Sequence, residues 1–375
     1  MIEIRELEPT KSNLRKFTKF QIDLYDGNPY YVPPLISDDV ATLDPKKNPA
    51  FDFCESIYFM AYRDGKPVGR IAGIINHQVN GYHDGATARF GFIDFVDDDE
   101  VSAALLEAVE EWARGKGMKK IIGPLGFTDL DHEGMLVDGF HELSTMATIY
   151  NYPYYPRHMQ RLGYEKESDW VEFVMEVPDG IPDKYNRIAD IVKKKFGLKV
   201  LKFKSRKKIK EEYGRALFEL VNDAYAGLYE YSRLSDRQID YYINIYLGLL
   251  DLNLVTLVVD KDDKLVGVGI SMPSMSRALQ KSKGRLFPLG WMHLLKGLKG
   301  KNDRVDLLLV AVKPEYQNKG VNALLFQDLI PYYIKKGYRF AESNPEMETN
   351  AKVQGQWEYF AHRQHRRRRS FAKQL

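Results

Sequence analysis

The chain repeats a pattern of secondary-structure signals, and this repeat limits its fold more than any other feature. Paired apolar runs flank short polar turns at 63–66 and at 262–264, which is the pattern of two β-hairpins. Gly69 and Gly267, which follow these turns, are 198 residues apart, and the turn residues keep the same separation. We therefore predict that two copies of one fold follow each other along the chain.

A second pair of signals shows where the copies differ in length. Apolar residues recur at helical spacing over 100–118, and this helix ends at Gly117. The corresponding later helix ends at Gly337, so these two glycines are 220 residues apart instead of 198. The difference of 22 residues predicts an insertion in the second copy, and we place it at 276–303.

The same signals divide the chain. Each copy contains, in order, a strand, helices, a hairpin, a strand, a helix and further strands, and this alternation is typical of an α/β (α+β) fold. We predict a first unit over 1–178 and a second unit over 198–375. A lysine-rich helix over 179–197 connects them.

The second copy contains a strand, a polar turn and a helix that together favour an anion. The apolar run 307–312 predicts a buried strand, and Pro314 ends it. Apolar residues from Val321 onward recur at helical spacing. Residues 317–320 then leave backbone N–H groups unpaired at the positive end of the helix dipole. An ordinary strand-to-helix connection would have the same pattern.

This turn resembles the acyl-CoA-binding motif of the GNAT acyltransferase superfamily, Arg/Gln-x-x-Gly-x-Gly/Ala. Gln317 and Gly320 match the motif, and Asn322 differs, with a side chain where the family keeps the backbone bare. The resemblance implies two tandem GNAT-like folds, each with a mixed central sheet flanked by helices. The chain also resembles an uncharacterised bacterial family of this length through the segments 28–35, 48–49, 69–72 and 122–124.

The resemblance implies that the second copy binds acetyl-CoA or another acyl-CoA as co-substrate. Backbone groups of the strand would meet the thioester and the pantetheine arm, and the turn would meet the pyrophosphate. The implied binding residues are Leu309, Val310, Ala311, Val312, Gln317, Asn318, Lys319, Gly320, Val321, Asn322 and Asn350.

The first copy lacks this turn. Residues 97–100 are four carboxylates, and they stand at the start of its helix without a glycine. Acidic residues cap a helix well but repel a pyrophosphate. We therefore predict one acyl-CoA site per chain, with the first copy as a structural or acceptor-shaping domain.

The implied reaction is direct attack of an amine on a thioester, which needs a base for the amine and an acid for the thiolate. The resemblance points to a tyrosine after Asn350 as the acid, and Tyr359 is the nearest match, although it is also explained as a core aromatic residue. Glu342 is the first candidate for the base, with Glu346 and Glu348 beside it. Surface carboxylates, or deprotonation through water, remain alternatives.

The composition of the chain indicates its cellular compartment and the classes of partner that it can bind. The chain has 55 basic and 52 acidic residues, and this net charge of +3 makes nucleic acid an unlikely partner. A single cysteine excludes an internal disulfide, no leader precedes the first strand, and no apolar stretch approaches the roughly 18 residues of a membrane span. We expect a cytoplasmic protein with a small-molecule or peptide amine as acceptor, no membrane partner and no metal.

Several interpretations stay open. The basic and apolar insertion 276–303 is a lid over the acyl donor, a surface-seeking segment, or a helix packed on the sheet. The arginines 366–369 bind phosphates or belong to a solvated edge strand. The main prediction is an N-acyltransferase with acetyl-CoA or another acyl-CoA as donor. The alternatives are a non-catalytic binding protein and a tRNA-dependent aminoacyl transferase.

Overall fold

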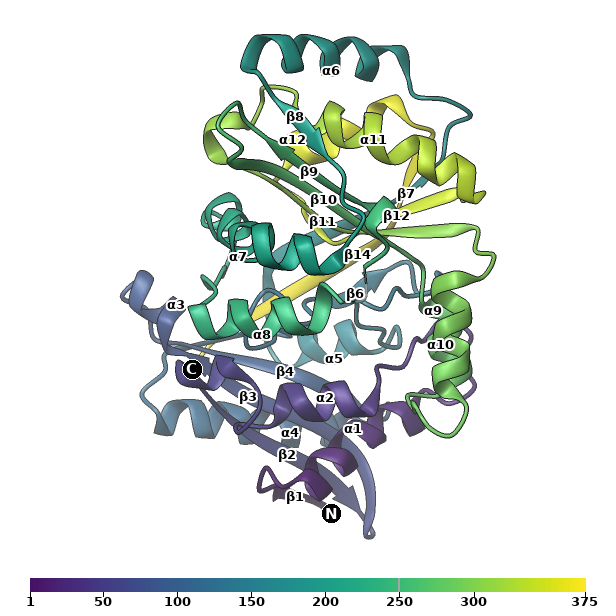
Figure 1. Cartoon of the computed structure of the whole chain (residues 1–375). Coiled ribbons are helices and arrows are strands. Elements are labelled where there is room, and N and C mark those ends of the chain that lie inside the picture. Colours follow the sequence, from purple (N-terminus) through teal and green to yellow (C-terminus); the bar gives the residue numbers. More distant parts are fainter. Residues whose placement is uncertain (249) are drawn as a thin grey trace.

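The computed structural model describes residues 1–248 and 250–375, and its centre is one large twisted sheet (Figure 1). The strand order is β1-β2-β3-β4-β5-β14-β7-β12-β11-β10-β9-β8, with β6 beside β14 and β13 beside β7. Elements of the first half are β1 Ile2–Glu6, α1 Lys11–Leu24, α2 Ile36–Leu43, β2 Cys54–Arg63, β3 Lys66–Asn76, α3 His77–Tyr82, β4 Thr87–Phe95, α4 Asp99–Gly115, β5 Lys120–Gly123, β6 Met135–Asp138, α5 Tyr155–Arg161 and β7 Glu165–Glu176.

The second half begins with helix α6 and repeats this order. Its elements are α6 Asp183–Phe196, β8 Lys199–Leu201, α7 Arg206–Tyr225, α8 Asp236–Tyr246, β9 Val255–Val259, β10 Leu265–Pro273, α9 Ser276–Ser282, α10 Gly290–Lys299, β11 Arg304–Val312, α11 Val321–Lys336, β12 Phe340–Ser343, β13 Glu346–Met347, α12 Ala351–Gln354 and β14 His362–Gln374. The predicted α/β repeat is confirmed, since β9–β10 corresponds to β2–β3 and α11 to α4. Helices α9 and α10 form the predicted insertion.

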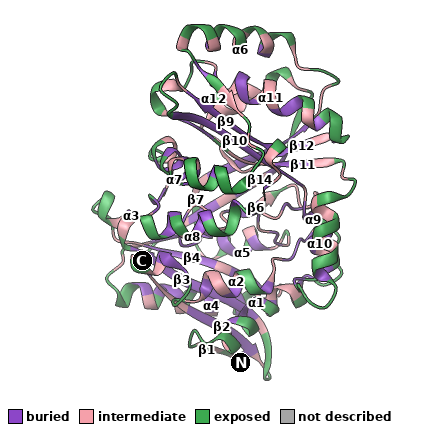
Figure 2. Ribbon diagram, viewed as in Figure 1, coloured by how far each residue is buried: buried purple, intermediate pink, exposed green. Residues whose placement is uncertain are grey.

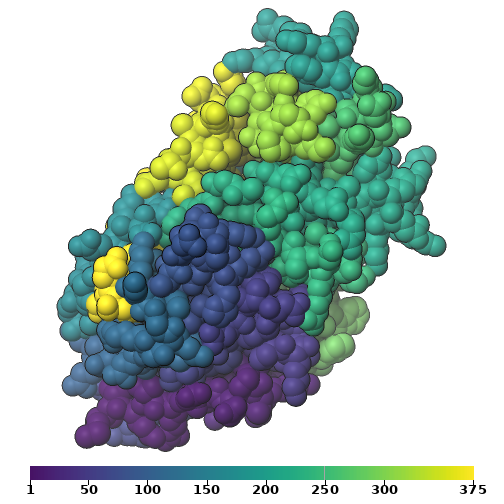
Figure 3. All heavy atoms as spheres, turned by 90° about the vertical axis from the view of Figure 1, so that its left-hand side faces the viewer, coloured from purple at the N-terminus to yellow at the C-terminus, as the bar shows by residue number. Residues whose placement is uncertain are grey.

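The last strands of the two halves are exchanged. Strand β14 pairs antiparallel with β5 of the first half, with Phe371 opposite Gly123. Strand β7 pairs antiparallel with β12 of the second half, with Met175 opposite Ala341. In Figure 1 the yellow strand β14 runs down into the first half, and Figure 3 shows the C-terminal residues emerging among the blue residues of that half. The predicted units 1–178 and 198–375 therefore describe the repeat along the chain, but the sheet does not divide there.

Two of the four arginines 366–369 of β14 are fully buried, and the other two are partly buried. Arg366 and Arg368 are fully buried and share the buried carboxylate of Glu172 on β7. Arg367 and Arg369 both pair with Asp169, which is also buried. The interpretation of this segment as a solvated edge strand was wrong, because β14 has β5 and β7 as neighbours. Its buried, paired arginines also leave the tRNA alternative without its proposed binding residues.

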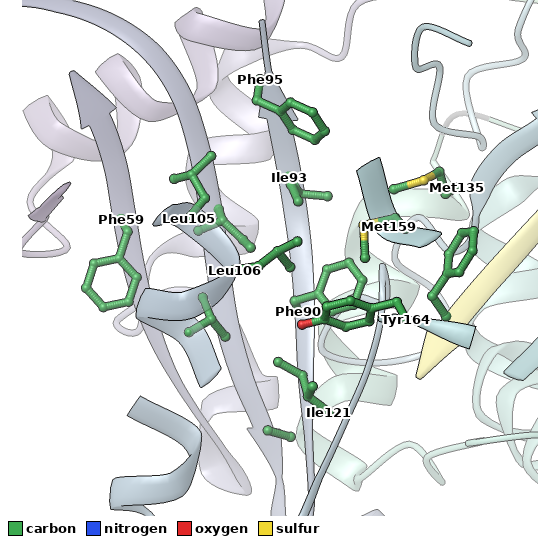
Figure 4. Packing of buried hydrophobic residues seen from close by; sticks show 14 of the residues in the cluster. Phe59, Phe90, Ile93, Phe95, Leu105, Leu106, Ile121, Met135, Met159 and Tyr164 are labelled. Atoms are coloured by element: carbon green, nitrogen blue, oxygen red, sulfur yellow. The ribbon is translucent and has the colours of Figure 1, made fainter. Parts of the chain in front are cut away.

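Each half has its own hydrophobic core. In the first half, α4 lays its buried face, including Leu105 and Leu106, against Phe59 and Phe90 of the sheet (Figure 4). Figure 2 shows the buried residues concentrated on the strands, with the outer faces of the helices exposed. Connecting helix α6 packs on α11 through Tyr185 and its neighbours. This packing holds the start of α11 in place beside the candidate site.

Among the residues that the structure describes, no helix is long and apolar enough to cross a bilayer.

Candidate functional site

Strands β11 and β12 diverge and open one edge of the second half. They pair in parallel only from Arg304 opposite Phe340 to Leu307 opposite Ser343, where β12 ends and β11 continues. Residues 307–309 are half-buried, and Val310 is 38% exposed. The predicted burial of the whole run 307–312 was wrong at these residues because β12 does not follow β11 to its end.

The open edge of β11 presents backbone groups. The carbonyl of Val310 accepts a hydrogen bond from the Tyr225 hydroxyl at 2.9 Å, and that of Val312 accepts one from the Gln317 side chain at 3.1 Å. Lys313 donates its amide to the carbonyl of Val266 of β10, so the backbone groups of the odd-numbered residues at this end of β11 face β10. The N–H and C=O of one strand residue point to the same edge, so the amides of Val310 and Val312 face the opening.

The turn after β11 leads directly into the N-terminus of α11. Gln317, Asn318 and Lys319 are exposed, and Gly320 takes the N-cap position at a φ of 82° without a side-chain cap. Among the described residues no acceptor pairs with the amides of 320–322. This end of the helix therefore has the free N–H groups that an anion needs.

Two neighbours shape this turn. A Cβ on Gly320 would lie 2.6 Å from Ile188 of α6, so glycine is required both by its φ and by the packing of the connecting helix. The amide side chain of Asn322, which departs from the family motif, donates to Gln356 at 3.1 Å. Asn322 is thus held by a specific partner.

In the corresponding part of the first half, side chains bond to the backbone, although β4 also continues past its last pair with β5, Arg89 opposite Ile122. Asp98 caps α4, because its carboxylate accepts from the amides of Glu100 and Val101 at 2.9 and 3.4 Å. The carbonyl of Phe95 on β4 accepts a hydrogen bond from the Tyr154 hydroxyl, and its amide donates one to the Tyr155 hydroxyl. The Asp98 carboxylate therefore binds the first amides of α4, whereas the corresponding amides of α11 in the second half are free.

Tyr359, predicted as the acid, lies at an exposed junction with helix α6. The ammonium group of Lys184 donates to its hydroxyl, its ring is 5.7 Å from that of Tyr185, and it is 43% exposed. Asn350 caps α12 by accepting from the amide of Val353 at 3.3 Å. The contacts of both residues give no support to a role beside the open edge of β11.

Glu342, predicted as the base, lies at the point where β11 and β12 separate but is not free. Its carboxylate is buried and accepts hydrogen bonds from Arg304 and, at 3.0 Å, from Arg366. Glu348 likewise bridges Lys166 and Arg367. Glu346 accepts from the indole of Trp357 at 3.0 Å, and burial raises its pKa to about 7.

The structure adds three groups that the sequence did not single out. Tyr225 ends α7 and touches β11 at Val310, and burial raises its pKa to about 12. Asp129 and Glu133 lie on a loop of the first half whose Leu130 packs against the cluster that contains Ala311. Burial raises the pKa values of both carboxyl groups, that of Asp129 to about 7. No motif marks these residues, because they come from segments far apart in the sequence.

The loop 126–134 is tied to the second half by direct contacts. Asp129 accepts a hydrogen bond from the amide of Ser232 at 2.8 Å. Arg89 of β4 binds both the carbonyl and the carboxylate of Glu230 at 3.0 Å. The rings of Tyr231 and Tyr225 are 6.0 Å apart, which connects these carboxylates to the residue that touches β11.

Comparison with known proteins agrees with this architecture. Residues 215–358 match the acetyltransferase (GNAT) family. A tandem GNAT protein from the clavulanic acid biosynthesis pathway superposes on the whole chain and on 98% of its own, with a TM-score of 0.58 at 12% identity. A GCN5-related N-acetyltransferase from Sphaerobacter thermophilus gives a TM-score of 0.51 at 12% identity, over 100% of this chain and 95% of the other.

Two relatives are similar in sequence over most of their length. Protein YghO of Escherichia coli is 27% identical over 97% of this chain and 94% of its own. A bacterial ceramide synthase of Caulobacter vibrioides is 28% identical over 88% of this chain and 84% of its own. The predicted tandem arrangement is confirmed by the full-length structural match.

Proposed function

Since the chain belongs to the GNAT superfamily, we propose that it is an N-acyltransferase that moves an acyl group from acyl-CoA to an amine at its second half. This proposal rests mainly on one observation, which is that an open strand edge and an uncapped helix N-terminus lie next to each other in the second half only. The open edge of β11 leads into the uncapped N-terminus of α11 at 320–322, whereas in the first half side chains already bond to the backbone at both places.

Different groups of the chain bind different parts of the acyl-CoA, from the turn 317–320 to the open edge of β11. The turn 317–320 and the first amides of α11 bind the pyrophosphate. The pantetheine arm follows the open edge of β11, where the amides of Val310 and Val312 can bond to it and polarise the thioester carbonyl. An incoming amine then attacks the carbonyl carbon, an N–C bond forms, and the C–S bond breaks.

Two protons have to move in this reaction. We assign the amine proton to the carboxylate pair Asp129 and Glu133, because a base whose pKa is near 7 is matched to neutral pH. We assign the proton for the thiolate to Tyr225, whose hydroxyl already lies at Val310. The thiol has a pKa of roughly 8.5, which is below the value of about 12 to which burial raises the pKa of Tyr225. The proton therefore has to move to the sulfur as the C–S bond breaks, because its transfer to the free thiolate would be uphill.

The acceptor that we favour is an amine with an apolar chain. One relative is named a ceramide synthase, and a ceramide is the amide of a fatty acid with a long-chain amino alcohol. The half-buried leucines 307–309 and the exposed Val310 offer apolar surface beside the reacting carbonyl. A short amine with acetyl-CoA as donor is the second candidate, supported by the acetyltransferase family match.

Calorimetric titration with acetyl-CoA and with a long-chain acyl-CoA tests the donor site. We expect one site per chain and at least tenfold weaker binding for Lys319→Glu, which places a carboxylate at the exposed turn. Lys335→Glu, at the exposed far end of α11, is the matched control and should bind normally. Two equal sites, or unchanged binding by Lys319→Glu, would contradict the proposed site.

Release of the CoA thiol tests the reaction. We expect release with a long-chain amino alcohol as acceptor, and slower release with a short primary amine or a lysine peptide. Binding of acyl-CoA without release for any of these acceptors would favour the non-catalytic alternative. Faster release with the short amine would favour the second candidate.

A further inference from the structure

The insertion in the second half exposes a group of large apolar side chains. Phe287 is 73% exposed and Leu289 is 61% exposed, and these residues lie between α9 and α10. Helix α10, which follows this loop (Figure 1), adds further exposed apolar side chains. The full set, which we call the apolar face, is Leu286, Phe287, Leu289, Trp291, Met292 and Leu295.

The opposite side of α10 is well packed, so the apolar face is not a sign of a loosely attached segment. Leu294 and Leu298 pack with Met272, Met275 and Leu279 in a cluster that also includes Val32 of the first half. The amide of Ile36 donates to the carbonyl of Gly284 at 2.9 Å. The two helices α9 and α10 and the loop between them, which we call the helical hairpin, are therefore fixed against the first half by one side. The other side of this hairpin, with the apolar face, is uncovered.

The position of the hairpin also tests the interpretation of 276–303 as a lid over the acyl donor. The hairpin precedes Arg304, at the start of β11, whereas the acyl-CoA turn follows Val312, at its end. The hairpin's partners are residues of α9, of β10 and of the first half. These contacts give no support to a lid over the pyrophosphate.

Basic residues surround the apolar face. Among the described residues, Lys281, Lys296, Lys299 and Lys301 have no carboxylate within ion-pair distance, and Lys283 contacts only the exposed Asp26, at 3.3 Å. A cavity of about 1,020 Å³ opens beside α10. Its basic lining residues are Arg277, Lys281, Lys296, Lys301, Arg304 and Lys336, against the acidic Glu142, Asp303 and Glu342.

We propose that this hairpin docks the protein on the surface of an anionic lipid bilayer. The side chains of the apolar face enter the boundary between headgroups and acyl chains, and the lysines around them bind the lipid phosphates. An indole such as that of Trp291 suits this boundary, because it has an apolar body and a polar N–H. The proposal replaces the expectation that the chain has no membrane partner, and it involves no span.

Charge decides between a bilayer and a second copy of the chain. Two copies that paired through the apolar face would bring two sets of unpaired lysines together, and like charges at an interface oppose association. An anionic bilayer offers the opposite charge over its whole surface. An anionic bilayer can therefore bury the apolar face and also bind the lysines around it.

Flotation of the full-length protein with vesicles tests the proposal. We expect binding to vesicles that contain phosphatidylglycerol, at least tenfold weaker binding to pure phosphatidylcholine, and a loss of binding as salt rises. Phe287→Ser combined with Trp291→Ser should lower binding at least tenfold, and Lys296→Glu combined with Lys299→Glu should do the same. Tyr246→Ser changes an exposed aromatic residue elsewhere and should bind normally.

Tryptophan fluorescence gives a second readout. The emission of Trp291 should shift to shorter wavelength on anionic vesicles, and Trp291→Phe should lose that shift while it keeps most of the binding. Equal binding to both lipids, normal binding by the serine variants, or a concentration-dependent dimer without vesicle binding would overturn the proposal. Acyl-CoA titration of each variant shows that it is folded and tests the donor site separately.

Discussion

Arg366 donates a hydrogen bond to Glu172 at 2.7 Å although 194 residues separate them, and both side chains are fully buried. The same carboxylate also accepts from Arg368. These contacts join β14 to β7, the two strands that the halves exchange. The two guanidiniums hold the pKa of Glu172 below its usual range, although burial by itself would raise it. The exchange therefore rests on a charge network as well as on the backbone ladder.

Replacing Glu172 with leucine should destabilise the protein strongly. The change leaves Arg366 and Arg368 buried without their shared carboxylate, and breaking a buried pair in this way costs about 3–5 kcal/mol. Urea denaturation measures the loss. Glu348→Gln, which removes a partly exposed partner of Lys166 and Arg367, is the control and should cost less than about 1 kcal/mol. Equal effects of the two changes would show that the buried network contributes little.

Replacing Asp306 with asparagine should stabilise the protein at alkaline pH. Asp306 is buried, neither of its oxygens has a hydrogen-bond partner among the described residues, and burial raises its pKa to about 7. The folded state therefore holds a proton from about pH 4 to 7 where the unfolded state does not, so stability falls as pH rises through this window. We expect a gain of about 1–4 kcal/mol at pH 8 that shrinks below pH 7 and disappears near pH 4.

Thermal or urea denaturation at several pH values measures this gain. Asp303→Asn, at an exposed neighbouring position, should show no such pH-dependent gain. A gain for Asp306→Asn that is as large at pH 5 as at pH 8 would rule out the titration as its cause.

Tyr225→Phe should slow the reaction more than Tyr359→Phe. The Tyr225 hydroxyl contacts the carbonyl of Val310 on the open edge, whereas the Tyr359 hydroxyl contacts Lys184 on the connecting helix. If Tyr225 protonates the thiolate, its loss should lower kcat about a hundredfold or more and leave the Kd for acyl-CoA nearly unchanged. Steady-state kinetics and calorimetry separate the two effects. Full activity of Tyr225→Phe, with a loss in Tyr359→Phe, would restore the sequence-based assignment.

The rate should depend on pH through the carboxylate pair. A base has to be unprotonated to accept the amine proton, so kcat/KM should rise as pH increases through about 7, the value to which burial raises the pKa of Asp129. Asp129→Asn and Glu133→Gln are measured separately, because the two groups titrate as a pair. We expect each variant to lower the rate and to move or abolish the rise. A profile that is unchanged in both variants would exclude the pair and direct attention to Glu346.

The sequence by itself determined the local features of this protein. The two hairpins, the helices that end at Gly117 and Gly337, and the 22-residue insertion follow from apolar spacing and turn residues, which act over a few positions along the chain. The strand, turn and helix around Gly320 could be recognised for the same reason. Their φ value and free amides are local properties that a short motif encodes.

Only the tertiary structure decided which distant segments meet. The pairing of Glu172 with Arg366, the capture of Glu342 by two arginines, and the contact of Tyr225 with Val310 join residues far apart in the chain. Periodicity gives the conformation of β14 but not its neighbours, because strands of either half offer it the same backbone hydrogen bonds. The neighbours were set by burial and charge compensation across the exchanged strands, and these depend on the whole folded chain.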